Sequence, residues 1–92
     1  MKLEFDPAKN ARNIRERGLS FDLVRQLDWE RALYGIDDRA DYGELRRVAI
    51  APLDGRLHFV CFVEIPGGIR VVSFRKTNPR ENRRYAEETA NE

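Results

Sequence analysis

The sequence has little of the residue types that build metal centres and disulfide frameworks. Its 92 residues include one cysteine, Cys61, and one histidine, His58, so there is neither a disulfide framework nor the ligand spacing of a zinc site. Cys61 lies in an apolar stretch, which favours a buried structural thiol over a nucleophile. The acidic residues at positions 37–44 do not have the spacing of a calcium-binding EF-hand. We therefore expect neither a metal nor another cofactor.

Long apolar runs are also missing. No stretch is long enough to cross a bilayer, and no apolar segment of a signal peptide is present, so we expect a cytoplasmic protein that makes no membrane contact. A length of 92 residues, with 41% apolar and 36% charged residues, is typical of one small globular domain that spans residues 1–92.

The charges are unevenly distributed, although the formal net charge is only +1. Residues 16–45 carry eight acids against four bases, whereas residues 68–86 carry six bases and one acid. A positive surface of this kind suits a polyanion. The same pattern is typical of a solvated helix face whose arginines pair with nearby acids, and the sequence leaves both interpretations open.

Capping signals predict two helices near the N-terminus. Lys2–Phe5 alternates polar and apolar residues like a short strand. Asp6-Pro7 then begins a helix that continues to about Arg17, where Gly18 suits the left-handed position after a helix. Ser20 caps a second, short helix with core-facing apolar residues at positions 21, 24 and 27. The apolar side of the first helix is thin and consists of Ala8, Ala11 and Ile14. We expect this side to face inward and to leave Lys9 and Asn13 outward.

The second half of the chain predicts an antiparallel sheet. Candidate strands lie at Glu30–Ile36, Leu45–Ala51, Leu57–Ile65 and from Gly68 onward, with a loop at Asp37–Gly43 and a hairpin turn at Leu53–Gly55. One face of the third candidate is wholly apolar (Leu57, Phe59, Cys61, Val63, Ile65). The order of elements predicts an α+β domain with about four antiparallel strands, two N-terminal helices and a C-terminal helix. We expect the helices on one face of the sheet and the other face open.

The segment Gly68–Tyr85 carries the strongest functional signal. It begins as a β-branched strand and changes at Thr77-Asn78-Pro79 into a helix, with Arg75 and Lys76 at the strand end. Arginines at positions 80, 83 and 84 share one face of that helix by their i, i+3, i+4 spacing. A strand end beside a helix start forms a concave corner with oriented N–H donors, which suits phosphate.

Short motifs along nearly the whole chain resemble the BrnT toxins. In the first half they are Phe5-Asp6-Pro7 with Lys9 and Asn13, then Gly18-Leu19-Ser20-Phe21. In the second half they are Asp54-Gly55-Arg56, Ile69-Arg70-Val71-Val72-Ser73, Arg75-Lys76, Arg80-Glu81 and Arg84-Tyr85. One departure is Arg17, which stands where the family commonly has histidine.

The resemblance implies a RelE-like fold and a small metal-independent ribonuclease of a type II toxin–antitoxin system. Such a toxin cuts RNA, inhibits translation and stops growth. The resemblance also implies neutralisation by a DNA-binding antitoxin of the BrnA kind. The chain would then reach operator DNA only through that antitoxin.

Metal-free RNA cleavage needs three chemical groups. One takes the proton of the 2′-hydroxyl, cations stabilise the charge that develops on the phosphate, and an acid protonates the leaving oxygen. Our candidate cations are Arg75, Lys76 and Arg80, with Glu44 as a base and Arg46 as a clamp. Each of these is also consistent with an ordinary ion pair, such as a cross-strand pair. Our candidates for RNA contact are Lys9, Asn13, Arg83, Arg84 and Tyr85.

His58 would be the natural acid–base group near neutral pH, but a lone histidine in a strand is more often structural.

Two other functions fit the same residues. One is a non-catalytic RNA- or ribosome-binding module, and the other is an inactive toxin homologue that acts as a corepressor. The sequence does not separate these functions, because phosphate binding is common to all of them.

Overall fold

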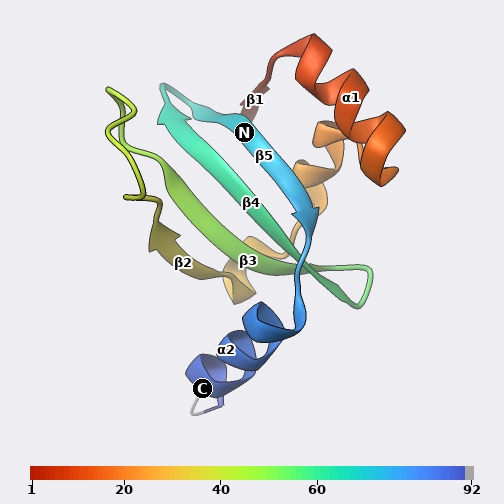
Figure 1. Ribbon diagram of the computed structural model, residues 1–92, viewed down its shortest axis with the longest axis vertical. Helices are drawn as coiled ribbons and strands as arrows, with labels where there is room; N and C mark the ends of the chain where they lie inside the picture. Colours follow the sequence, from red (N-terminus) through yellow and green to blue (C-terminus); the bar gives the residue numbers. More distant parts are fainter. Residues whose placement is uncertain (91–92) are drawn as a thin grey trace.

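A five-stranded mixed sheet forms the centre of the structure, a computed structural model that describes residues 1–90 (Figure 1). The strands are β1 (Lys2–Glu4), β2 (Leu33–Ile36), β3 (Arg47–Leu53), β4 (Arg56–Ile65) and β5 (Gly68–Lys76), in the spatial order β1-β5-β4-β3-β2. The α-helices are α1 (Pro7–Arg17) and α2 (Pro79–Thr89), and two 3-10 helices, η1 (Phe21–Gln26) and η2 (Trp29–Arg31), lie between α1 and β2. The α+β class is therefore confirmed. Within the described residues no helix is long and apolar enough to span a membrane.

The expected sheet of about four antiparallel strands needs correction at β1. This strand pairs in parallel with β5, and the N–H of Lys2 donates to the carbonyl of Gly67 at 2.9 Å. The pairs β2–β3, β3–β4 and β4–β5 are antiparallel, as expected. The parallel pair arises because the chain leaves β1 through α1 and returns to the same edge of the sheet only after β4.

The expected second α-helix is wrong, because the segment forms 3-10 turns instead. The N–H of Leu23 donates to the carbonyl of Ser20 at 3.1 Å, and that of Leu27 donates to Val24 at 3.3 Å. These bonds join residues three positions apart, which is the pattern of a 3-10 helix. The expected cap is present, since the Ser20 hydroxyl accepts from the N–H of Asp22 at 3.2 Å.

Several strand boundaries also differ from expectation, and β3 begins at Arg47 rather than at residue 45. β2 begins at Leu33 rather than at residue 30, because η2 occupies the preceding residues. β3 continues through Pro52, which we expected to end it. The carbonyl of Pro52 accepts from Asp28 on the side away from β4, so the missing N–H of the proline removes no bond to β4. The hairpin turn is confirmed, with positive φ at Asp54 (50°) and Gly55 (76°).

Local caps define both α-helices as expected. The Asp6 carboxylate accepts from the N–H of Ala8 at 2.8 Å, and Gly18 ends α1 with φ of +67°. At the start of α2, the Asn78 side chain accepts from the N–H of Glu81 at 2.9 Å. The Glu81 carboxylate accepts in return from the N–H of Asn78 at 3.0 Å, which completes a capping box.

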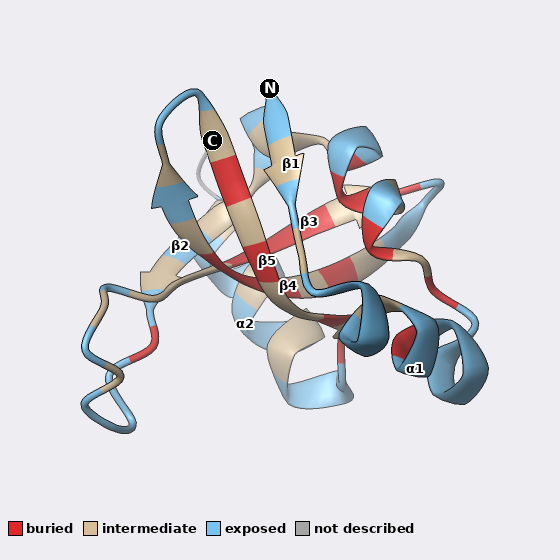
Figure 2. Cartoon of the chain, turned by 90° about the horizontal axis from the view of Figure 1, so that it is seen from above, coloured by how far each residue is buried: buried red, intermediate tan, exposed pale blue. Residues whose placement is uncertain are grey.

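The hydrophobic core lies on one face of the sheet, which we call the core face (Figure 2). Residues directly opposite in antiparallel strands share a face, so Val60 of β4 and its partner Phe74 of β5 both point into this core. The exposed fraction is 0% for both side chains. The buried residues Phe21 and Val24 of η1 belong to the same cluster. The 3-10 segment therefore provides the cover of the core face.

The wholly apolar side of β4 is not the core face. His58, Val60 and Phe62 point into the core, and all three are buried. Phe59 and Val63 point to the other side, where they are only partly covered. We call that side of the sheet the open face. Alternation alone could not decide which side is buried, because the cover comes from η1, a segment far away in the sequence.

The helix α1 contacts β5 through polar side chains. Its apolar residues Ala8, Ala11 and Ile14 are all exposed, contrary to the expectation that they form its inward side. The inward residues are Asn10, whose side chain accepts from the N–H of Phe21 at 2.7 Å, and the buried Asn13.

Candidate functional site

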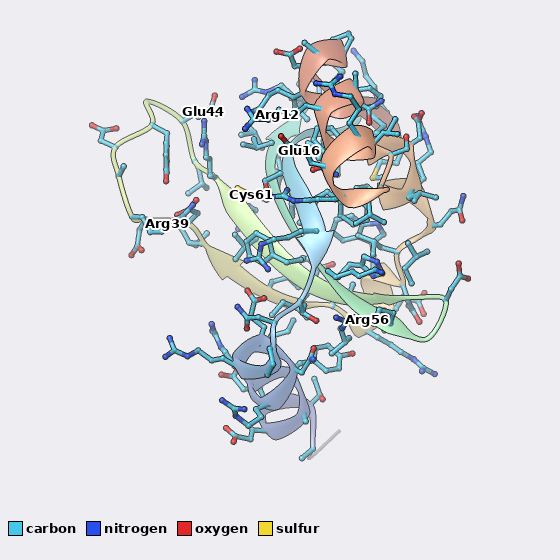
Figure 3. All side chains as sticks on the ribbon, turned by 45° about the vertical axis from the view of Figure 1, so that its right-hand side comes forward. Arg12, Glu16, Arg39, Glu44, Arg56 and Cys61 are labelled. Atoms are coloured by element: carbon cyan, nitrogen blue, oxygen red, sulfur yellow. The ribbon has the colours of Figure 1, made fainter. Side chains whose placement is uncertain are left out.

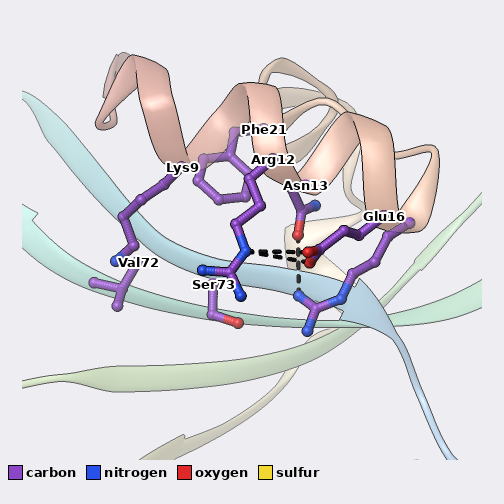
Figure 4. A pocket seen from close by; sticks show the side chains of 8 residues that line it. Lys9, Arg12, Asn13, Glu16, Phe21, Val72 and Ser73 are labelled. Carbon is purple, nitrogen blue, oxygen red and sulfur yellow. Dashed lines mark hydrogen bonds and ion pairs between the residues drawn. The ribbon is translucent and has the colours of Figure 1, made fainter.

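A groove between α1 and β5 gathers basic and polar side chains (Figure 4). Lys9 and Arg12 lie one turn apart on α1 and extend over Val72 and Ser73 of β5. The Nε of Arg12 donates to both carboxylate oxygens of Glu16, at 3.2 and 3.3 Å. The groove has a volume of about 170 Å³ and is open to solvent. It brings the cations of Lys9, Arg12 and Arg17 together with the hydroxyl of Ser73 at the edge of the open face.

Asn13, which we expected to contact RNA, is buried beneath this groove. Its amide donates to the carbonyls of Leu19 at 2.9 Å and Phe74 at 3.0 Å, and its oxygen accepts from Arg17 at 2.9 Å. β1 pairs only with residues 68–70 of β5, so the carbonyl of Phe74 lies beyond the reach of that neighbouring strand. Asn13 and Arg17 supply its donors instead. The hydrogen bonds of Asn13 therefore attach α1 to the sheet.

A second group of charges lies at the end of the open face where β5 begins. An Nη of Arg70 donates to both oxygens of Glu44 at 2.7 Å, and the Nε of Arg46 donates to the same carboxylate at 3.3 Å. The guanidinium of Arg46 stacks 3.9 Å from the ring centre of Tyr42. The bonds from Arg70, and then those from Arg46, lower the pKa of Glu44 below its ordinary value. Glu44 is therefore a carboxylate at neutral pH.

A buried carboxylate lies beside this group. Asp37 accepts from the Nε and an Nη of Arg39, both at 2.8 Å, and these bonds lower its pKa to about 2. Burial, followed by the charge of Asp37, raises the pKa of Cys61, which supports the expected structural thiol. The charges of Arg46, Arg39 and Lys9 act on the same thiol in the opposite direction.

Arg75 lies near the other end of the open face and joins it to α2. Its two Nη atoms donate to the carboxylate oxygens of Glu81 at 2.8 and 3.1 Å, and its guanidinium lies 4.2 Å from the ring centre of Phe59. The bonds from Arg75 are the largest cause of the lowered pKa of Glu81. Lys76 follows in the strand and points to the opposite side, and Arg80 is exposed on α2.

The expected catalytic residues therefore form two groups. Five residues of β5 separate Arg70 from Arg75, which is about 16 Å at 3.3 Å per residue. Figure 3 shows Glu44 and Arg12 toward the same end of the molecule, away from α2. The structure does not bring Glu44 and Arg46 together with Arg75, Lys76 and Arg80.

The remaining candidates are divided between surface and structural positions. Arg83 is exposed, and Arg84 donates to Glu88 at 3.4 Å. The hydroxyl of Tyr85 donates to the carbonyl of Arg31 at 2.7 Å and so holds α2 against η2. His58 is buried in a stacked contact with Phe74, and its burial lowers its pKa. As the structural interpretation of a strand histidine expects, its ring belongs to the core.

Three residues of the site were missed from the sequence. Arg12 could have been found, because it shares a helix face with Lys9 by i, i+3 spacing. Arg70 and Ser73 could not, because their common side depends on a register shift beside Cys61, which makes Val72 an extra residue in β5.

The fold and this face define a class: a small α+β domain whose open sheet face presents clustered arginine, lysine and carboxylate side chains. Within residues 1–90, no three His, Cys, Asp or Glu side chains are grouped as metal ligands. Residues 5–81 match the family described as the ribonuclease toxin BrnT of type II toxin–antitoxin systems. The chain belongs to the BrnT family, which confirms the resemblance found in the sequence and indicates a ribonuclease toxin with an RNA target and an antitoxin partner. No curated protein matches the chain.

Proposed function

We propose that the chain is a metal-independent endoribonuclease with a RelE-like fold, which cuts RNA in the cytoplasm and thereby inhibits translation and growth. A BrnA-like antitoxin neutralises it, and the chain reaches operator DNA only through that antitoxin. The observation that carries the proposal is the Glu44–Arg46–Arg70 group on the open face. This group combines an ionised carboxylate with cations, as RNA cleavage without a metal requires.

In this mechanism an RNA phosphate competes with Glu44 for the two arginines. Arg46 and Arg70 present planar forks that bind a phosphate through paired hydrogen bonds. Once these bonds move to the phosphate, the pKa of Glu44 rises towards its ordinary value, since the arginines are the cause of its depression. The freed carboxylate then accepts the proton of the 2′-hydroxyl, whose oxygen bonds to the phosphorus while the bond to the 5′-oxygen breaks. The arginines stabilise the charge that develops on the phosphate, and the leaving 5′-oxygen takes a proton from water.

The other candidates bind the RNA on either side of the cleaved bond. Lys9 and Arg12 contact the backbone from the α1 groove, where both side chains are exposed. At the other end, Arg75, Lys76 and Arg80 continue the positive path, and Arg83, Arg84 and Tyr85 extend it along α2. Asn13 contributes by holding α1 in place, because its amide is fully occupied within the protein.

A non-catalytic RNA-binding module remains a second candidate, and one observation favours it. Arg46, Arg70 and Arg75 are all bonded to carboxylates, and the single histidine is buried, so no free imidazole is present to protonate the leaving oxygen. A module of this kind, or an inactive homologue that acts as a corepressor, would bind RNA or the antitoxin without cutting RNA.

The first test is expression of the chain alone. We expect growth arrest and RNA degradation, both relieved by the small protein encoded beside it. The purified chain should cut RNA equally well with and without EDTA and leave 2′,3′-cyclic or 3′-phosphate ends. Binding without cleavage would establish the second candidate instead. Products with 3′-hydroxyl ends that require Mg²⁺ would overturn the mechanism.

The second test separates the two roles of Glu44. Glu44→Gln should abolish cleavage, because the base is lost, yet it should bind RNA more tightly, because Arg46 and Arg70 lose a competing anion. Glu88→Gln is the matched control, since it removes the partner of one arginine on α2 and should leave cleavage unchanged. An active Glu44→Gln variant would remove Glu44 from the mechanism.

The third test concerns the cations. Arg70→Lys keeps the charge but loses the fork, so we expect cleavage to fall by about one to two orders of magnitude. Arg15→Ala is the control, because Arg15 is about 200° around the helix from the inward Asn13 and points away from the sheet. Equal losses in the two variants would show that the loss is not specific to Arg70 and would remove Arg70 from the mechanism.

A further inference from the structure

The strand β2 is an edge of the sheet that has no neighbour within the described residues (Figure 1). The opposite edge is the three-residue strand β1, which covers β5 together with α1. The sequence of β2, Leu-Tyr-Gly-Ile, contains neither proline nor a charged residue, which are the usual means of protecting an exposed edge. Its residues Tyr34 and Ile36 are large and apolar, yet they are 55% and 47% exposed.

The register shows which backbone groups of β2 are free. Asp37 donates its N–H to the carbonyl of Arg46 at 2.8 Å, as the next rung of the β2–β3 ladder. Pairs in an antiparallel ladder alternate between bonded and non-bonded, so Gly35 bonds to β3 whereas Tyr34 and Ile36 do not. The N–H and C=O groups of Tyr34 and Ile36 therefore point outward, away from the sheet.

Hollows flank this edge on both faces of the sheet. On the core face, beyond the cover of η1, a groove of about 370 Å³ begins beside Trp29 and Tyr34 and extends past Phe62 towards Ile69 of β5. On the open face, a hollow of about 140 Å³ lies between β2 and α2, where Gly35 offers no side chain over Val48. An extended chain that joins a sheet edge places alternate side chains on the two faces, so both hollows are positioned to receive them.

The charges around the β2 edge indicate which kind of partner segment can bind there. The segments on either side of β2 carry acidic residues, and after the ion pairs Arg31–Asp28 and Arg39–Asp37 they retain three exposed carboxylates: Glu30, Asp38 and Asp41. Arg84 of α2, which borders the hollow on the open face, is paired with Glu88. A second copy of the chain in antiparallel pairing would bring residue 30 of one copy towards residues 38–41 of the other, so carboxylates would meet carboxylates. A basic segment would meet opposite charges instead.

We propose that β2 receives a strand of a partner protein, an extended segment with apolar side chains on both faces and flanking Lys or Arg residues. The segment forms a sixth strand next to β2 and bonds to the outward backbone groups of Tyr34 and Ile36. Its apolar side chains occupy the two hollows. The inference rests on the antitoxin of the proposed function, and it assigns that partner a docking site at the β2 edge, next to the loop that carries Glu44.

Amide hydrogen exchange of the complex tests the inference directly. The probe is the small protein encoded beside this chain, purified and added in excess. The amides of Tyr34 and Ile36 should exchange rapidly in the free protein and slow by on the order of a hundredfold in the complex. The amide of Gly35 should be protected in both states, because it already bonds to β3. Fast exchange at Tyr34 and Ile36 in a complex that forms would overturn the inference.

Variants at residue 36 separate backbone pairing from side-chain contact. Ile36→Pro removes an outward N–H without removing a bond to β3, whereas Ile36→Ala keeps that N–H. We expect the proline variant to bind at least about tenfold more weakly than the alanine variant, which corresponds to about 1.4 kcal/mol. Ile14→Ala on α1 is the matched control, since Ile14 is also 47% exposed, and it should bind like the parent.

The remaining outcomes are also decisive. Equal affinity of the Ile36→Pro and Ile36→Ala variants would overturn backbone pairing. If the chain alone protected the amides of Tyr34 and Ile36 increasingly at higher concentration, a second copy would be the strand that joins β2, and the choice of partner would be overturned. The lack of any complex with the partner protein would also overturn that choice. RNA cleavage by the chain is measured separately, so failure of the ribonuclease proposal would be recognised as such.

Discussion

Asn13 offers the sharpest test of how α1 is attached to the sheet. Its amide donates to two buried carbonyls, those of Leu19 and Phe74. Asn13→Ala removes both donors. A buried polar group without a partner costs about 1–3 kcal/mol, and the carbonyl of Phe74 keeps a longer bond of 3.3 Å from Arg17. We therefore expect the free energy of unfolding to fall by about 2–4 kcal/mol.

A loss of this size is large for a chain of 92 residues. Domains of this length have a total stability of about 5–14 kcal/mol. The melting temperature should fall by on the order of 10–30 °C. Urea unfolding followed by circular dichroism measures the change, provided that the slope of the transition is the same in parent and variant. Asn13→Asp should be at least as harmful at pH 7, because a carboxylate cannot donate to the two carbonyls.

The control is Lys9→Ala, one turn away on the same helix, which should change the stability by less than about 0.5 kcal/mol because Lys9 is exposed. If Asn13→Ala lowered the free energy of unfolding by less than about 1 kcal/mol, Asn13 would not be what attaches α1 to β5. If that stable variant had also lost RNA binding, Asn13 would be a contact residue, as the sequence led us to expect.

Three further predictions concern stability. Asp37→Asn should be less stable than the parent above about pH 5, and urea titrations should show the difference vanishing towards pH 2. The native pKa of Asp37, about 2, lies below its ordinary value of 3.8, so the stabilising effect of the ionised carboxylate is lost as the pH falls. Arg75→Ala should lower the free energy of unfolding by about 1–2 kcal/mol, since it removes a largely covered ion pair to Glu81 at the start of α2; equal stability would show that α2 is held by other contacts. Gly68→Ala should displace β1, because a Cβ there would lie 1.8 Å from the carbonyl oxygen of Lys2, and faster amide exchange in β1 would reveal it.

The features that the sequence predicted well are local. The caps of both α-helices and the Asp54-Gly55 turn depend on residues within three or four positions of each other, so their signals lie within a short window. The boundary of α1 at Gly18 was predicted for the same reason, since it needs only a residue that tolerates positive φ. Such signals act before any tertiary contact forms.

The features that the sequence did not predict depend on distant partners. The inward side of α1 was expected to be its apolar side, but the Asn13 amide instead bonds to the carbonyl of Phe74 at the β5 edge. The sequence of α1 contains no signal for that carbonyl, because it belongs to a distant strand. The buried side of β4 depends in the same way on η1. For the site, the types of residue were predictable, whereas their division into two groups about 16 Å apart required the register of the sheet.

The arginines of the open face are held in place by carboxylates before any RNA arrives. Arg46 and Arg70 share Glu44, and Arg75 is held by Glu81. Pairing fixes the direction of each guanidinium, which reduces the ordering that RNA binding must supply, but it also makes the phosphate compete with an anion already present. The two carboxylates differ in this respect. Glu81 also caps α2, so its release would disturb the helix, whereas Glu44 lies in a loop and can be released at little structural cost. Exchange of a carboxylate for a phosphate is therefore easiest at Glu44, where the proposed chemistry needs it.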